Sequence, residues 1–148
     1  MGKINLIDAL MRLSFKTANE LIITETNWPI KNTAPYAPTS EFECVSEDDY
    51  AYYMIRYHLL AFATQKVACV YWHQLIAPGY GLIDNREGTV RKRTAFDAYQ
   101  TMLSHLCDAQ FSSYQKSKND HTLVCSTPRG TLHISWTLTS TPIYSYKA

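Results

Sequence analysis

The sequence predicts an α/β fold with parallel strands, followed by a short antiparallel β segment. Two apolar runs without polar alternation, "LIIT" at 21–24 and "VACVYWHQL" at 67–75, are each followed by a helical pattern. Such runs are typical of parallel strands that are buried on both faces. Beyond Ala109 the pattern changes to β runs, "HTLVCS" and "GTLHISWTL", joined by a hairpin turn at residues 127–130. The predicted order is helix, strand, helix, strand, helix and an antiparallel sheet.

Three helices are expected from apolar residues that recur at three-to-four spacing. The first covers residues 4–18, and Asn19 is a suitable residue for its C-terminal end. Ser46 with an acidic residue three positions later predicts the start of a second helix at 47–64. The third helix begins at Thr94 and carries its apolar stripe to Leu106.

Composition excludes several classes of function. The 148 residues suffice for one domain, and a formal net charge of +1 argues against a nucleic-acid partner. The four cysteines and five histidines lack the spacing of a metal site, so no cofactor is expected. No apolar run reaches the roughly 18 residues of a membrane span, and the N-terminal segment lacks a signal-peptide core. As written, the chain is expected to be cytoplasmic and to have no membrane partner, although a longer parent could be secreted.

Candidate binding residues follow the two predicted strands. In parallel α/β folds ligands bind beyond the carboxyl ends of the strands, and two long loops begin there, at 27–45 and 76–93. Glu25 ends the first strand, while Trp72 and Gln74 share one face at the end of the second. A carboxylate, an indole and an amide at one mouth suit a carbohydrate. On pattern alone Trp72 fits a packed core better than a sugar platform, because aromatic side chains in buried strands usually pack.

Two further segments receive a structural interpretation. His73 lies on the opposite face from Trp72 and is therefore expected to point toward the covering helices as a buried histidine. The basic stretch "VRKR" at 90–93 is expected to be a solvated segment before the third helix.

Three motifs together resemble one enzyme family. "IITETNWP" (22–29), "VYWHQLIAPGYGLID" (70–84) and "RKRTAFDAYQTMLSHL" (91–106) resemble the closing third of clan A retaining glycoside hydrolases, which are (β/α)₈ TIM barrels. The resemblance implies that residues 1–108 form the last two strand–helix units of such a barrel. Residues 109–148 would then be a β tail, the start or remnant of an accessory β-sandwich.

The resemblance also implies roles for particular residues. Glu25 occupies the place of the catalytic nucleophile, and Trp72 that of the tryptophan lining the sugar subsite next to the cleaved bond. The further candidates for contact with the carbohydrate substrate are Gln74, Trp28, Asn27 and Tyr80.

The sequence departs from the family in one essential respect. Retaining glycosidases need two carboxyl groups about 5–5.5 Å apart, and in this clan the acid/base glutamate follows an asparagine on an earlier strand. The pair Asn19-Glu20 precedes a strand and is rejected for that role. We therefore expect a C-terminal fragment of a longer hydrolase that has little or no turnover alone and associates with the missing barrel portion or with itself. The alternatives are a non-catalytic carbohydrate-binding or pseudo-enzyme remnant, and an unrelated α+β oligomerising domain.

Overall fold

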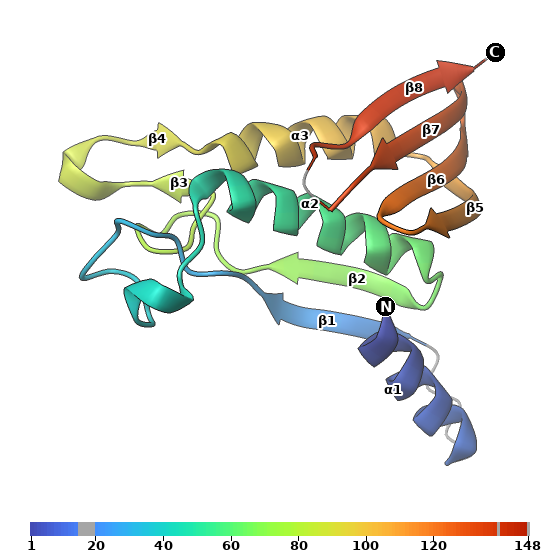
Figure 1. The fold of residues 1–148 in the computed structure, drawn as a ribbon, viewed down its shortest axis with the longest axis horizontal. Coiled ribbons are helices and arrows are strands. Elements are labelled where there is room, and N and C mark those ends of the chain that lie inside the picture. Colours follow the sequence, from blue (N-terminus) through green and yellow to red (C-terminus); the bar gives the residue numbers. More distant parts are fainter. Residues whose placement is uncertain (15–19, 139, 148) are drawn as a thin grey trace. The chain divides into compact units, whose positions relative to one another are not determined.

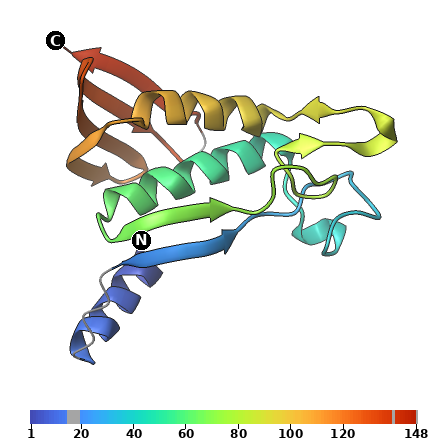
Figure 2. The ribbon, with the colours of Figure 1, turned by 180° about the vertical axis from the view of Figure 1, so that it is seen from behind.

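The computed structural model describes residues 1–14, 20–138 and 140–147, and these form a mixed α/β arrangement (Figures 1 and 2). The helices in this part of the chain are α1 (Gly2–Leu13), α2 (Glu47–Ala63) and α3 (Thr94–Leu106). The predicted helices are confirmed to within a few residues, except that the predicted end of the first, with Asn19, lies outside the described residues. None of the described helices is long and apolar enough to cross a membrane.

The strands of the described residues form three separate sheets. Strands β1 (Leu21–Thr26) and β2 (Val67–Trp72) make a two-stranded parallel sheet, as predicted (Figure 1). A short hairpin joins β3 (Ile83–Asp84) to β4 (Arg91–Lys92), and β5 to β8 form an antiparallel sheet. No barrel closure is seen among the described strands.

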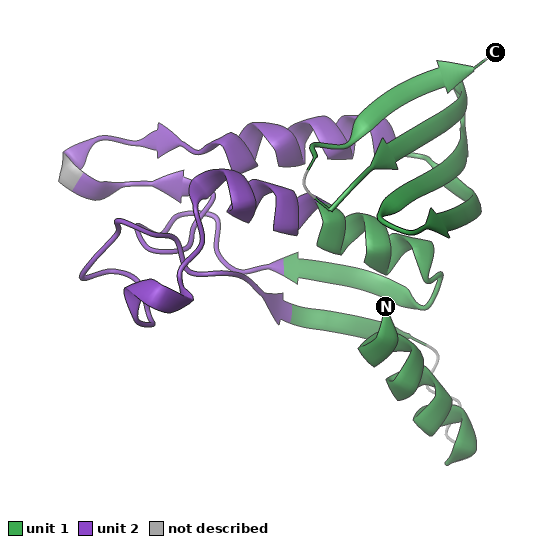
Figure 3. Cartoon of the chain, in the orientation of Figure 1, with its two compact units in different colours: residues 1–24, 56–71, 107–148 green, residues 25–55, 72–106 purple. Residues whose placement is uncertain are grey.

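The chain divides into two compact units, shown in Figure 3. Unit 1 consists of residues 1–24, 56–71 and 107–148, and unit 2 of residues 25–55 and 72–106. The four-stranded sheet begins at Gln110, at the start of the predicted β tail, but the units group this tail with earlier segments. The division into domains at residue 108 stays a prediction.

In unit 1, the predicted burial of the parallel strands on both faces is wrong. Ile22 is 47% exposed and Tyr71 58% exposed, and burial alternates along β1. The reason is that, among the described residues, each of the two strands pairs along one edge only. Helix α1 likewise has no buried residue, although its stripe of Leu6, Leu10 and Leu13 is apolar.

The antiparallel sheet of unit 1 consists of β5 (Gln110–Ser117), β6 (Asp120–Thr127), β7 (Gly130–Trp136) and β8 (Ile143–Lys147). The predicted turn is confirmed, because Thr127 pairs with Gly130. Alternation buries one face of β6 and β7, which presents Leu123, Cys125, Leu132, Ile134 and Trp136.

Unit 2 contains the two long loops and the start of α2. The capping prediction is confirmed: Ser46 Oγ accepts a hydrogen bond from the backbone N–H of Asp49 at 3.0 Å. The first loop is tied to the second, because the N–H of Ile30 donates to the carbonyl of Gly79 at 2.9 Å. Ile30 is fully buried, so these loops form a packed structure that can fix the residues they carry.

Candidate functional site

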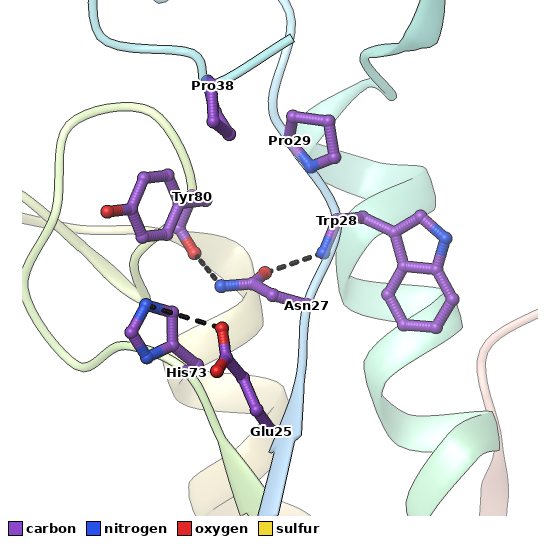
Figure 4. Close-up of a pocket in the computed structure, with 7 residues that line it drawn as sticks. All are labelled: Glu25, Asn27, Trp28, Pro29, Pro38, His73 and Tyr80. Carbon is purple, nitrogen blue, oxygen red and sulfur yellow. Dashed lines mark hydrogen bonds and ion pairs between the residues drawn. The ribbon is translucent and has the colours of Figure 1, made fainter.

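The carboxyl ends of β1 and β2 bring Glu25 and His73 together. Glu25 is the penultimate residue of β1, and His73 follows the last residue of β2. The backbone N–H of His73 donates to the carbonyl of Thr26 at 3.2 Å, which fixes the two chain segments side by side. Figure 4 shows the Glu25 carboxylate facing the imidazole, with Nε2 of His73 3.8 Å from Oε1 of Glu25.

Both side chains are open to solvent. The side chain of Glu25 is 68% exposed and that of His73 37% exposed. A separation of 3.8 Å is too long for a hydrogen bond, so the contact is an ion pair only when His73 is protonated. The other close partner of His73 is Tyr80, whose ring stacks on the imidazole with centroids 5.6 Å apart and planes 10° apart.

Asn27 and Tyr50 fix the backbone at Tyr80. The carbonyl of Tyr80 accepts hydrogen bonds from Asn27 Nδ2 and from the hydroxyl of Tyr50, both at 2.7 Å. Asn27 Oδ1 in turn accepts the backbone N–H of Trp28 at 2.7 Å. The side-chain amide of Asn27 therefore positions the loop. The sequence predicted a different role for Asn27, contact with the substrate.

A pocket of about 250 Å³ opens beside these residues (Figure 4). Its volume is near the lower end for small-molecule sites, which suits one monosaccharide ring better than a long chain. Glu25 is the one carboxyl group among the described residues that line it. The lining consists of Glu25, Asn27, Trp28, Pro29, Pro38, His73 and Tyr80.

Of the predicted site residues, Trp72 and Gln74 are not brought to this pocket. The indole N–H of Trp72 donates to the hydroxyl of Tyr50 at 2.7 Å, and its ring stacks on Trp28 at 5.7 Å. Trp72 thus packs against α2, the core arrangement that its pattern also fitted. Gln74 is exposed, and its backbone carbonyl accepts the N–H of Leu82.

The expected direction of His73 is wrong. Alternation does place it opposite Trp72, but the large apolar indole lies against α2 and the imidazole faces the pocket. The end of the strand is the signal that could have placed His73 at the site. Strand β2 ends at Trp72, so His73 is the first residue of the loop. Polar residues directly after parallel strands are the positions that ligands meet.

Unit 2 also holds a cluster of paired charges next to the same loop. The carboxylate of Asp84 lies 3.0 Å from Nη2 of Arg93 and 2.7 Å from Nη2 of Arg86. Arg91 bridges Asp84 and Glu47. The side chain of Arg93 is 0% exposed, so the interpretation of residues 90–93 as a solvated stretch is wrong at this position. Arg93 also donates to the carbonyl of Pro78, which anchors the loop two residues before Tyr80.

The hydroxyl of Tyr50 links the indole of Trp72 to the backbone carbonyl of Tyr80, and removing this hydroxyl tests the link. Burial raises the pKa of Tyr50 to about 12, so the hydroxyl keeps its proton and donates at neutral pH. We expect Tyr50→Phe to lower the free energy of unfolding by about 1–2 kcal/mol, since two hydrogen bonds are lost. Urea unfolding followed by tryptophan fluorescence measures this loss. Tyr52→Phe, at a half-buried position on the same helix, is the control and should leave the midpoint almost unchanged.

Comparison with family models, with curated proteins and with solved structures finds no match. Within the described residues no cluster of His, Cys, Asp or Glu is arranged to hold a metal ion. The side chains at the site provide an exposed carboxylate, an imidazole beside it and a small pocket lined by aromatic and proline residues.

Proposed function

We propose that the pocket at Glu25 is the sugar-binding site of a retaining O-glycoside hydrolase and that Glu25 is its nucleophile. The observation that carries this proposal is the position of Glu25: an exposed carboxylate at the carboxyl end of a parallel strand, on the wall of a pocket sized for one sugar ring. On this proposal β1 with α2 and β2 with α3 are the last two strand–helix units of a (β/α)₈ barrel.

In this reaction Glu25 would attack the anomeric carbon and form a glycosyl-enzyme, while a second carboxyl group protonates the departing oxygen. Water would then attack the glycosyl-enzyme and release the sugar. No second carboxyl group is among the described residues lining the pocket, so the proton donor would have to come from another part of a longer protein. Ile22 and Tyr71 are exposed apolar side chains on strands that, among the described residues, pair along one edge only. They support association with the remaining part of a barrel or self-association.

The proposal is tested with a substrate that needs no proton donor. In 2-deoxy-2-fluoroglycosyl fluorides the fluoride leaves without protonation, and the resulting glycosyl-enzyme is long-lived. Incubation with gluco-, galacto-, manno- and xylo-configured probes should add the mass of one fluorosugar to the chain. Glu25→Gln should abolish the addition, whereas Glu20→Gln, immediately before the start of the same strand, should not.

A second candidate, carbohydrate binding without chemistry, is favoured by the single carboxyl group in the pocket. An NMR titration beside the labelling experiment separates the two. Reversible binding of the parent sugars, seen as shifts in the NMR resonances of pocket residues without any mass addition, would favour the binding protein. Neither binding nor mass addition would leave the unrelated oligomerising domain as the better interpretation.

A further inference from the structure

The gap between His73 and Glu25 has the dimensions of a binding site for one hydroxyl group. The 3.8 Å separation of Nε2 and Oε1 leaves room for a hydroxyl oxygen about 2.8 Å from each atom. Such a hydroxyl would donate to the carboxylate and accept from the imidazole N–H. Within the described residues, no hydrogen bond is made by either ring nitrogen of His73 or by the carboxylate of Glu25.

The imidazole is held in place before any ligand arrives. It stacks on Tyr80 with planes 10° apart, and the carbonyl of Tyr80 is fixed by Asn27 and Tyr50. The backbone N–H of His73 is itself bonded to Thr26. A ring nitrogen that is already oriented loses little freedom on binding, which favours affinity for a matching hydroxyl.

We propose that His73 is a substrate-binding residue that, together with Glu25, binds the sugar hydroxyl on the carbon next to the anomeric centre. This inference rests on the proposed function, because it uses Glu25 as the group that meets the anomeric carbon. When one carboxylate oxygen faces that carbon, the other lies near the 2-hydroxyl, and this contact strengthens in the transition state. The site then selects pyranosides with a free 2-hydroxyl over 2-deoxy and 2-acetamido sugars.

A matched pair of cationic sugar mimics tests the proposal on the full chain. Isofagomine places its nitrogen at the anomeric position and lacks a 2-hydroxyl, whereas noeuromycin is the same ring with that hydroxyl. We expect the unmodified chain to bind noeuromycin at least tenfold more tightly, by calorimetry, in the gluco or galacto configuration. His73→Phe keeps a ring for Tyr80 but has no donor, and it should reduce this preference at least fivefold. His73→Gln keeps a donor and should retain most of it.

The outcomes separate this inference from the proposed function. Isofagomine affinity should be equal in the chain and its two His73 variants, lost in Glu25→Gln, and unchanged in His133→Phe, which alters a histidine of the four-stranded sheet. An unchanged preference in His73→Phe would overturn the role of His73 while leaving that of Glu25 intact. Loss in His73→Gln with retention in His73→Phe would show that the ring serves only to stack on Tyr80, which also overturns it. Binding of neither compound would overturn both proposals.

Discussion

Replacing Asp84 with asparagine is expected to lower the free energy of unfolding by about 3–5 kcal/mol, because it breaks a buried charge cluster. Asp84 is 4% exposed and pairs with Arg86, Arg91 and Arg93 at 2.7, 3.3 and 3.0 Å. Without this carboxylate the buried Arg93 keeps Glu47, 3.2 Å away, as its remaining ion-pair partner. Urea unfolding by tryptophan fluorescence gives the size of the effect, and hydrogen exchange of peptides from 76–93 locates it.

The same cluster predicts how stability changes with pH. Hydrogen bonds from Arg86 lower the pKa of Asp84, and those from Arg91 lower the pKa of Glu47, from ordinary values of 3.8 and 4.5. The unfolded chain therefore binds protons at these sites first as the pH falls. Their stabilising contribution is complete above about pH 5 and is lost progressively as the pH falls through the ordinary pKa values toward the lowered values of the folded chain. Asp84→Asn should flatten this acid dependence, whereas Asp97→Asn, at an exposed position, should not; equal slopes for both would contradict the assignment.

Gly79→Ala is expected to destabilise unit 2 by about 3 kcal/mol, because the new methyl group has no room. A Cβ at this position would lie 2.2 Å from the carbonyl oxygen of Tyr36 and 2.8 Å from the backbone nitrogen of Ala37. Backbone atoms cannot rotate away as a side chain can, so the loop must shift. The adjacent Tyr80 and the imidazole stacked on it would shift with it.

Two measurements follow from this expectation. Urea unfolding should show the loss of stability, and the NMR resonances of the His73 ring should move in Gly79→Ala. Gly2→Ala is the matched control, since a Cβ there meets nothing within 4 Å. If Gly79→Ala is as stable as the unmodified chain and leaves the His73 resonances in place, the close packing of the two loops is wrong.

The sequence predicts the order of elements well because most of the signals are local. The apolar spacing of α2, its Ser46 cap and the turn at 127–130 depend on neighbouring residues, and each is found where it was expected. The strand β5 was missed because "QFSSYQKS" has too little apolar alternation, and its partner β6 provides the pairing.

The candidate site was predicted only in part, because some of its features depend on local sequence and others on distant parts of the chain. The placement of Glu25 depends on the end of one strand, which the change from "LII" to polar residues indicates. The face assignment at Trp72 and His73 depends on which side α2 covers, and alternation within one strand carries no information on that. The burial of Arg93 depends on its ion-pair partners Asp84 and Glu47. Glu47 lies 46 positions away in the chain, so local sequence patterns do not indicate the contact.

The most direct test of the central claim is to identify the residue that carries the sugar after labelling. The chain is incubated with the fluoroglycosyl fluoride that adds mass, digested, and sequenced by tandem mass spectrometry. We predict the fluorosugar on Glu25, within the peptide that contains "IITETNWP". A label on any other residue, or labelling that persists in Glu25→Gln, would contradict the assignment of Glu25 as the nucleophile.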